Sequence, residues 1–525
     1  MSSLLHELPH IACERSPHAV ALQHDSDSYS YSQLQSDIYS LSSAFITLGL
    51  RRQDRIAIFL PKQYETVASI FAASAAGCVF VPINPLLKAA QVQHILRDCS
   101  VRVLITTHER VLALKEILPT CSELQHLVLT RSTESHEAPL TTTINTWHWN
   151  DLIHRRTPVT AHRVIDSDMA AILYTSGSTG KPKGVVLSHR NLVTGAHSVA
   201  SYLENTAEDK LLAVLPLSFD YGLSQLTTAF HVGASVHLME YLFPKDIPRR
   251  VAEARITGLA GVPPLWCQLA ELNWPDAATQ SLRYITNSGG TLPSTTLDRL
   301  RQSLPHTKPF LMYGLTEAFR STYLPPEQID HRQGSIGKAI PNAEILVVKP
   351  DGSPCAPHEP GELVHRGSLV AMGYWNNAEK TAERFKPVPT QNSNLPLAEM
   401  AVWSGDTVKM DEDGYLYFIG RNDEMIKTSG YRVSPNEIEE ILMTSGLVSE
   451  VVAVGITHPT LGQVIAVAAV AAPSTTEDKG QLLRKCKEQL PAFMVPTHIE
   501  FRMSLPRNQN GKYDRVRLAL ELSQS

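Results

Sequence analysis

A loop rich in glycine and hydroxyl side chains, followed by two lysines, is the first place in this sequence where residue types and spacing point to chemistry. It reads YTSGSTGKPKG over residues 174–184 and continues the apolar run AAILYT. The glycines let backbone N–H groups approach a ligand closely, and the hydroxyls can donate hydrogen bonds. Lys181 and Lys183 add positive charge. Donors and cations together suit a polyphosphate.

Two common motifs of similar composition are excluded by their spacing. A Walker A loop needs a glycine five residues before Gly180 and a serine or threonine after the lysine, but Thr175 and Pro182 stand there. The loop is not a GxSxG nucleophile elbow either, because GSTG has the wrong spacing. The loop therefore predicts a phosphate-binding site that is not a Walker A loop.

Length and composition indicate a globular protein of several domains, and the spacing of its cysteines indicates a reducing compartment. The chain has 525 residues, 43% hydrophobic and 19% charged, and its net charge of -5 argues against a nucleic-acid partner held by bulk electrostatics. The seven cysteines form no CxxC pair. The N-terminus lacks a signal-peptide pattern, and the most apolar run, Thr66 to Val81, is too broken to span a membrane. We expect a cytoplasmic location.

The elements that must position the loop follow an α/β pattern. Short apolar runs end repeatedly in loops of small or polar residues, as in LLAVLP before LSFDYG, ITGLAGV before PP, LRYIT before NSGG and FLM before YGLTE. Helical stretches such as 191–203 and 295–303 lie between them, which predicts layers with largely parallel central strands. Because ligands bind at the carboxyl ends of such strands, these loops should share one crevice.

After Gly420 the sequence changes character. SPNE at 434–437 has the pattern of a capping box, with Pro435 opening a helix that should run to Gly446, and the strand-like runs VVAVGI and VIAVAAVAA follow. About 100 residues of α+β pattern predict a separate small domain. We expect a large α/β N-terminal domain over residues 1–421 and a small α+β C-terminal domain over residues 422–525.

Six motifs in order make the chain resemble the adenylate-forming superfamily, which includes acyl-CoA synthetases, the adenylation domains of nonribosomal peptide synthesis and luciferases. They are YTSGSTGKPKG, NSGG at 287–290 followed by Pro293, YGLTE at 313–317, WSGD at 403–406, GRNDEMIKTSGYRVSP at 420–435 and NQNGK at 508–512. More narrowly, PLSFDYGLSQLTTAF, GLAGVPPLW and YGLTEAFRSTYLPP are similar to AMP-forming acyl-CoA ligases associated with exosortase systems.

The resemblance implies a reaction in two steps. A carboxylate attacks the α-phosphate of ATP to give acyl-AMP and pyrophosphate, and the acyl group then passes to a thiol, either CoA or the phosphopantetheine of a separate carrier protein. The first step brings two anions together, so the site must stabilise developing negative charge. The resemblance also implies Mg2+, held by Glu317 and phosphate oxygens.

The same resemblance assigns roles to individual residues. The ATP phosphates would contact Thr175, Ser176, Gly177, Ser178, Thr179, Gly180, Lys181, Lys183, Gly184 and Thr316. The nucleoside would contact Gly289, Gly290, Tyr313, Gly314, Asp406 and Arg421. In the mobile C-terminal domain, Lys512 would be the catalytic lysine, Asp423 the hinge and Gly430 part of the pantetheine channel.

The substrate pocket should be lined by residues from three of the strand-end loops, namely Phe219, Asp220, Tyr221, Gly261, Val262 and Ser288. Asp220 stands where amino-acid-activating relatives place the aspartate that pairs with the α-ammonium group of the substrate. A buried unpaired carboxylate is costly, so Asp220 either meets a cation or accepts hydrogen bonds from the backbone of its loop. Small carboxylic acids and amino acids both stay open as substrates.

Other activities also fit the motifs. The chain could be an amino-acid-adenylating ligase, an amide-forming ligase with a small amine acceptor, or an oxygenase like luciferase, since each begins with the same adenylation. A scaffold without catalysis is disfavoured because Lys512, Glu317, Asp406 and Arg421 are all present.

The role of Lys512 can be tested directly. We expect Lys512→Ala to lower the rate of adenylation by about 10²- to 10³-fold, because the lysine would bridge the carboxylate and the α-phosphate during the first step. ATP–pyrophosphate exchange measures that step, and circular dichroism checks that the fold is intact. Full exchange activity in the folded variant would contradict the role.

Overall fold

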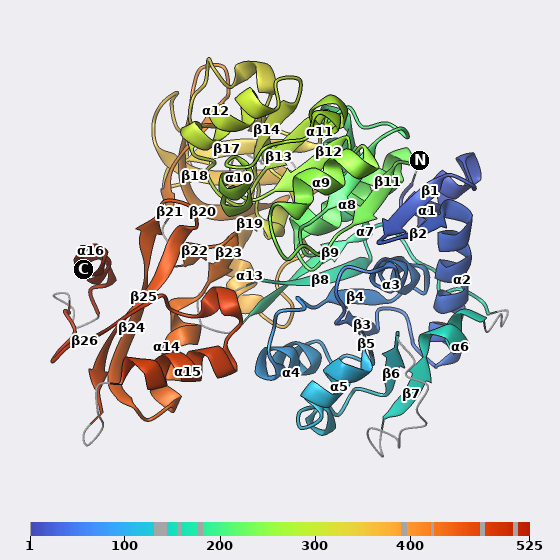
Figure 1. The fold of residues 1–525 in the computed structure, drawn as a ribbon, viewed down its shortest axis with the longest axis horizontal. Coiled ribbons are helices and arrows are strands. Elements are labelled where there is room, and N and C mark those ends of the chain that lie inside the picture. The colour runs from blue at the N-terminus through green and yellow to red at the C-terminus, as the bar shows by residue number, and fades with distance from the viewer. Residues whose placement is uncertain are drawn as a thin grey trace.

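The computed structural model describes residues 2–130, 144–154, 159–175, 182–389, 396–421, 425–472, 478–507 and 513–524. Within these ranges the chain forms a large N-terminal domain of mixed α/β structure and a small C-terminal domain (Figure 1). No helix in these ranges combines the length and the apolar character needed to cross a membrane.

A seven-stranded sheet leads into the phosphate loop. Its order is β7-β6-β5-β3-β4-β8-β9, and every neighbouring pair is parallel except β8 and β9. Inner strands such as β5, with the sequence VLIT, are apolar and fully buried, as expected for parallel strands covered on both faces. The strands are β3 (Arg55–Ile58), β4 (Val79–Pro82), β5 (Val103–Thr106), β6 (His126–Leu129), β7 (Asn145–His148), β8 (Met169–Thr175) and β9 (Lys183–Ser188).

The helices of this part are α1 (Glu7–Arg15), α2 (Tyr31–Thr47), α3 (Tyr64–Ala75), α4 (Ala89–Asp98), α5 (His108–Leu114), α6 (Trp149–His154) and α7 (His189–Tyr202). Helix α7 begins where Ser188 and Asn191 exchange hydrogen bonds in a capping box. This cap fixes the point at which β9 turns into a helix.

A longer sheet of 14 strands forms the rest of the N-terminal domain. Along its path the strands from β14 to β1 are parallel, and the remaining pairs are antiparallel. The strands are β1 (Val20–His24), β2 (Asp27–Ser30), β10 (Lys210–Ala213), β11 (Ser235–Leu238), β12 (Gly258–Gly261), β13 (Tyr284–Asn287), β14 (Lys308–Tyr313), β15 (Thr322–Leu324), β16 (Ser335–Ala339), β17 (Ala343–Val348), β18 (Gly361–Gly367), β19 (Phe385–Pro387), β20 (Met400–Met410) and β21 (Leu416–Arg421).

The predicted convergence of strand-end loops is confirmed for this sheet. In the register of the parallel strands, Gly261 of β12 lies opposite Asn287 of β13, which lies opposite Leu311 of β14. The loops that follow therefore leave the same edge. The helices of this part are α8 (Asp220–Val232), α9 (Asp246–Ala254), α10 (Pro263–Leu269), α11 (Asp276–Ser281), α12 (Ser294–Ser303) and α13 (Ala378–Arg384).

The C-terminal domain is built on a five-stranded sheet with a hydrophobic core on each face. Helices α14 and α15 cover one face, where Ile438, Leu482 and Val467 are buried together, and α16 covers the other through Leu518. The elements are β22 (Ile426–Thr428), β23 (Tyr431–Val433), α14 (Pro435–Thr444), β24 (Val448–His458), β25 (Gly462–Ala471), α15 (Lys479–Gln489), β26 (His498–Phe501) and α16 (Arg515–Ser523).

The predicted capping box at residues 434–437 is wrong, although the helix exists. Ser434 is the N-cap residue of α14 but makes no side-chain capping hydrogen bond, and the helix ends at Thr444. The Glu437 side chain instead accepts a hydrogen bond from Gln91 on α4, at 3.2 Å. A contact between the two domains has replaced the local one.

Candidate active site

Three side chains from different segments meet at the start of β9. Lys183 Nζ lies 3.1 Å from Glu317 Oε1 and 2.7 Å from the hydroxyl of Tyr374, and that hydroxyl donates to the same Glu317 oxygen at 2.6 Å. Burial alone would raise the pKa of Glu317, but the charge of Lys183 and the hydrogen bond from Tyr374 lower it to about 2. Glu317 is therefore ionised at neutral pH.

This cluster lies beside the two ends of the phosphate loop. Thr175 and Lys183 face each other across the β8–β9 pair, and Thr316 precedes Glu317 in a short 3-10 helix, η2 (Thr316–Ala318). The Thr175 hydroxyl is buried without a hydrogen-bond partner among the described residues. The predicted phosphate contacts between them, Ser176, Gly177, Ser178, Thr179, Gly180 and Lys181, lie outside the described residues.

Gly184 has a packing role that its sequence position did not indicate. It lies in β9 opposite Tyr174, and a Cβ atom there would lie 2.6 Å from Ile172. The absence of a side chain is thus required by the neighbouring strand.

Asp406 is held in place by two hydroxyl groups. The hydroxyl of Tyr313 donates a hydrogen bond to its carboxylate, and its backbone N–H donates to Ser404 Oγ at 3.1 Å. Asp406 faces Arg421 in the β20–β21 register, although the Arg421 side chain lies outside the described part. Tyr313 and Asp406, 93 positions apart, are thus joined by a hydrogen bond that the sequence did not predict.

The loop after β13 forms a second wall of the same crevice. Asn287 Nδ2 donates to the Gly290 carbonyl at 3.0 Å, and Gly289 has a φ of +82°, which favours glycine. A Cβ atom at Gly290 would lie 3.2 Å from Pro263. Ser288 between them is buried, and Gly314 follows β14.

Two of the predicted substrate-pocket residues, Tyr221 and Gly261, pack against Thr286 of β13 or against a side chain bonded to it. The Tyr221 hydroxyl is hydrogen-bonded to Thr286 Oγ1 at 2.6 Å, and Trp266 Nε1 donates to the Thr286 carbonyl at 3.1 Å. A Cβ atom at Gly261 would lie 2.7 Å from the Trp266 ring, so this position has no room for a side chain. These contacts join α8, β12 and α10 into one wall.

Asp220 has both of the partners considered for it, a cation and a backbone N–H group, which is that of Tyr221. Arg320 Nη1 lies 3.1 Å from Asp220 Oδ2, and the two side chains are only 2% and 12% exposed. Burial raises the pKa of Asp220, although Arg320 opposes the shift. Sequence reasoning missed Arg320, and the available signal was a single charged residue in AFRSTYLPP, the continuation of YGLTE.

The C-terminal domain contacts this pocket through the β22–β23 turn. Gly430 has a φ of +81°, and a Cβ atom there would lie 2.9 Å from Val262. The next ring, Tyr431, packs edge-on against Phe219 at 5.3 Å and stacks on Phe493 at 3.8 Å. The turn therefore packs against Val262 and Phe219, two of the residues predicted to line the substrate pocket.

Lys512 and Asp423 lie outside the described residues. The residues flanking the Lys512 segment, Arg507 and Tyr513, pair across an isolated bridge, and Arg507 bonds Glu450 on β24 at 3.1 Å. Helix α16, which follows, lies at the outer edge of the C-terminal domain, whereas β22 and β23 face the N-terminal domain (Figure 1). The β22–β23 turn, and not this edge of the domain, is directed at the pocket.

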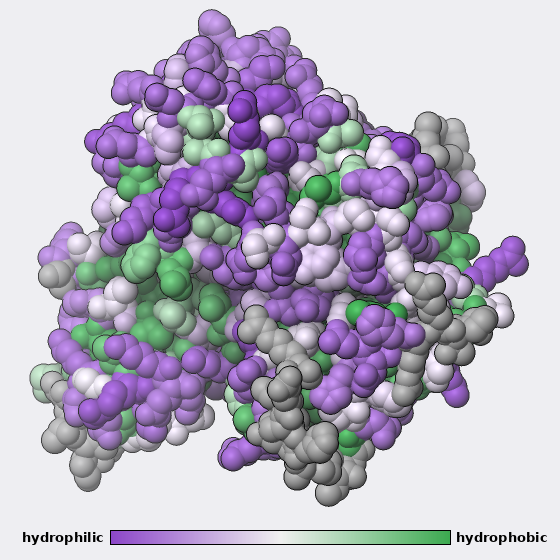
Figure 2. All heavy atoms as spheres, turned by 45° about the vertical axis from the view of Figure 1, so that its right-hand side comes forward, coloured by the Kyte–Doolittle hydropathy of each residue, from purple (hydrophilic) through white to green (hydrophobic). Residues whose placement is uncertain are grey.

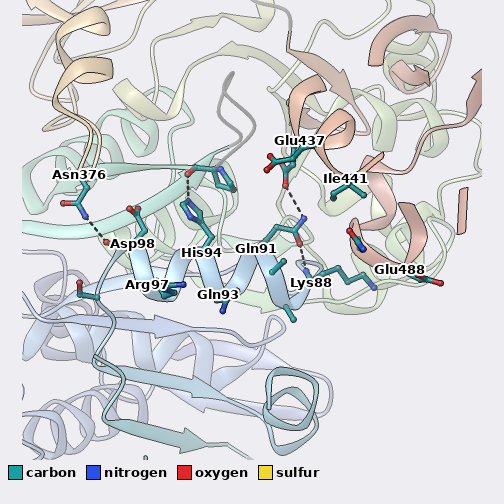
Figure 3. A pocket seen from close by; sticks show the side chains of 16 residues that line it. Lys88, Gln91, Gln93, His94, Arg97, Asp98, Asn376, Glu437, Ile441 and Glu488 are labelled. Carbon is teal, nitrogen blue, oxygen red and sulfur yellow. Dashed lines mark hydrogen bonds between the residues drawn. The ribbon is translucent and has the colours of Figure 1, made fainter. Parts of the chain in front are cut away.

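A polar pocket separates the domains beside the phosphate loop. Figure 2 shows the hollow between them, and Figure 3 shows α4 facing α14 across it. His94 is hydrogen-bonded to the Pro182 carbonyl at 3.0 Å. Burial raises the pKa of Glu437 to about 7. The charged or polar lining includes Lys88, Gln91, His94, Arg97, Glu437, Glu440 and Glu488.

Comparison with known proteins identifies the family. Residues 10–375 match the family described as AMP-binding enzyme, and residues 437–512 match the AMP-binding enzyme C-terminal domain. The chain belongs to the AMP-binding enzymes. It is a ligase that activates a carboxylate with ATP to an acyl adenylate and then transfers the acyl group.

Relatives of this AMP-binding enzyme cover nearly the whole chain. It is 30% identical over 496 residues to a long-chain-fatty-acid–CoA ligase of Salmonella typhimurium, covering 89% of this chain and 85% of that protein. It is 29% identical to a component of the linear gramicidin synthase of Brevibacillus parabrevis, over 96% of this chain and 6% of that protein. The solved structure of a double mutant of o-succinylbenzoate CoA synthetase from Bacillus subtilis matches with a TM-score of 0.80 at 25% identity, covering 97% of each chain.

The ion pair predicts how stability depends on pH. Because the pKa of Glu317 falls from 4.5 to about 2 on folding, its contribution is present above pH 4.5 and is lost as the pH falls toward 2. The full difference corresponds to roughly 3 kcal/mol. We expect Glu317→Gln to be less stable at neutral pH, since Lys183 loses its partner, but to lose less stability than the wild type on acidification.

Thermal denaturation at a series of pH values measures this difference. Glu253→Gln is the matched control, because that glutamate on α9 is 57% exposed and lies outside the cluster. Its curve should parallel that of the wild type. An equal loss of stability in Glu317→Gln and the wild type would contradict the assignment.

Proposed function

We propose that the ATP phosphates bind where Lys183, Glu317 and Tyr374 meet. The observation that carries this proposal is a largely buried ammonium group, fixed by an ionised carboxylate, directly after the phosphate loop. From this position Lys183 stabilises the charge that develops on the departing pyrophosphate, and the Thr316 hydroxyl binds the α-phosphate. The charged groups of Lys183 and Glu317 are already in position before ATP binds, so neither has to move.

Glu317 also fits as a ligand of Mg2+. Its carboxylate is ionised, with a pKa of about 2, and hard oxygen ligands are those that Mg2+ prefers. In the described part of the chain, no group of three or more His, Cys, Asp or Glu side chains is placed to hold a metal ion. Phosphate oxygens would therefore supply other ligands, and the ion, when bound, supplies neutralisation of phosphate charge.

Asp406 is proposed to bind the ribose hydroxyls. The Tyr313 hydroxyl fixes its carboxylate in a buried position, so little side-chain freedom is lost when the sugar binds. Arg421 lies opposite it in the sheet register and would contact the same sugar or its phosphate. Gly289 and Gly290 would admit the flat adenine base against the loop after β13.

We propose that this arrangement of the domains belongs to the second step. The contacts of Gly430 with Val262, and of Tyr431 with Phe219, bring the β22–β23 turn to the acyl pocket. Rotation about Asp423, at a domain boundary between residues 421 and 422, would exchange this turn for Lys512 during adenylation. The turn would line the path of a pantetheine arm, which favours a thiol as acceptor, from CoA or from a separate carrier protein.

The ion pair of Asp220 bears on the substrate. An α-ammonium group would have to compete with Arg320 for the carboxylate and would approach a second cation. This supports a carboxylic acid without an α-amino group, and the amino-acid-adenylating and amide-forming activities are the alternatives. Membership of the exosortase-associated branch and a cytoplasmic location stay predictions from the sequence.

The choice of substrate is tested by ATP–pyrophosphate exchange with pairs of an amino acid and its deaminated acid. We expect the deaminated acids to support faster exchange, because Asp220 already has its cation. Asp220→Asn should keep this preference, because Arg320 stays in place. Faster exchange with amino acids, abolished by Asp220→Asn, would instead identify an amino-acid-adenylating enzyme.

The role of the β22–β23 turn is tested by adding one methyl group. Gly430→Ala should slow thioester formation by at least about tenfold while exchange stays within about twofold, because a Cβ atom there would lie 2.9 Å from Val262. Gly446→Ala is the matched control, with a φ of +71° in the same domain but nothing within 4 Å of its Cβ. Equal loss of both half-reactions in Gly430→Ala, or equal effects of the two variants, would overturn the role.

A further inference from the structure

The Nε and Nη2 edge of the Arg320 guanidinium has no hydrogen-bond partner within the part of the chain that the structure describes. Nη1 donates to Asp220 at 3.1 Å and to the Phe319 carbonyl at 3.0 Å. Nε and Nη2 are buried, and neither has a hydrogen-bond partner among the described residues. The side chain is only 2% exposed. Since a buried donor without a partner is unfavourable, and a charged one more so, this edge needs an acceptor.

The Nε and Nη2 edge lies beside Tyr221, one of the residues predicted to line the acyl pocket. The guanidinium carbon lies 4.6 Å from the centre of the Tyr221 ring, whose hydroxyl is bonded to Thr286 on β13. Arg320 follows Glu317 by three residues, and Asp220 follows Phe219, which contacts the β22–β23 turn. Arg320 is therefore linked through the chain to the proposed phosphate site, and through its ion pair with Asp220 to the loop that contacts the β22–β23 turn.

We infer that the Nε and Nη2 edge of Arg320 binds an oxygen acceptor of the acyl substrate other than the carboxylate that reacts. The enzyme then selects acids that carry a second oxygen function over plain hydrocarbon acids. The planar fork of a guanidinium is suited to such oxygen atoms, and Arg320 acts as a specificity-determining residue. This inference rests on the proposed function, because it concerns the acid bound for adenylation.

Charge balance selects among the oxygen functions. Asp220 already neutralises Arg320, so a carbonyl or hydroxyl oxygen leaves the buried site neutral. A second carboxylate would add a negative charge in a site that already lies near Glu317, whose charge acts on Asp220. We therefore expect oxo and hydroxy acids to be better substrates than dicarboxylic acids, and all three to be better than the plain acid of equal length.

The test is ATP–pyrophosphate exchange with acids matched in length, each as the plain, oxo, hydroxy and dicarboxylic form, with the oxygen at successive positions. For the wild type, kcat/KM for the best oxygen-bearing acid should exceed that for the plain acid by about 10²-fold or more, because the plain acid leaves the buried donors unpaired. The ratio of the two values is the readout, since a general loss of structure lowers both.

Variants must not leave a charge unpaired. The double variant Asp220→Asn with Arg320→Met removes both charges and should reduce the preference to within about threefold, mainly by improving the plain acid. The thermal shift produced by ATP confirms that each variant is folded and binds nucleotide.

A second ion pair of the same domain is the control. Arg283 Nη2 and Asp209 Oδ2 lie 2.8 Å apart at the opposite edge of the sheet, before β13 and β10, away from the pocket. Asp209→Asn with Arg283→Met should leave the preference unchanged. A preference for oxygen-bearing acids that survives in the Asp220 and Arg320 double variant would overturn the inference.

The role of Arg320 and the proposed function can be disproved by different results. If the wild type exchanges plain acids as well as the oxygen-bearing ones, adenylation stands and the role of Arg320 is wrong. If no acid of the panel supports exchange while the protein binds ATP, the proposed function itself is wrong, and the inference falls with it.

Discussion

The contact between Lys183 and Glu317 is the interaction on which the rest of the active site depends. Lys183 belongs to β9 of the seven-stranded sheet, whereas Glu317 follows β14 of the longer sheet, so the ion pair joins the two. Either charge alone at this depth would be strongly destabilising, by several kcal/mol. The Tyr374 hydroxyl is hydrogen-bonded to both Lys183 and Glu317. The sheets must therefore be docked before a phosphate site exists at all.

Two other Arg–Asp ion pairs, Arg283 with Asp209 and Arg320 with Asp220, have different roles in the structure. Asp209 is saturated, because it accepts hydrogen bonds from Arg283, Thr257, Asn205 and the backbone of Thr206. This pair lies at the amino edge of the sheet and ties its elements together. Arg320, at the carboxyl edge, has one side engaged and one side without a partner among the described residues. Incomplete satisfaction at a strand end distinguishes a binding group from a structural one.

Contacts between the domains depend on where a side chain is absent and on which donor a buried carboxyl group meets. The β22–β23 turn can approach Val262 because Gly430 carries no side chain. Tyr431 stacks on Phe493 of its own domain, and its ring packs edge-on against Phe219 of the N-terminal domain. Glu437 was predicted to cap its own helix, yet it reaches Gln91 of the other domain. A local signal can be overruled in this way because a buried carboxyl group is satisfied by whichever donor the folded chain brings nearest.

Motifs of the linear chain were enough to predict the α/β architecture and the small C-terminal domain, and the family resemblance that they carry implied the two-step chemistry. These features depend on local patterns, namely apolar runs that end in short polar loops and glycines where a backbone must approach a ligand. Tyr374, and Arg320 as a partner of Asp220, required the folded structure. They depend on which side chains from distant segments share a buried space, and burial, which makes pairing of charges obligatory, is a property of the packed molecule and not of any one segment.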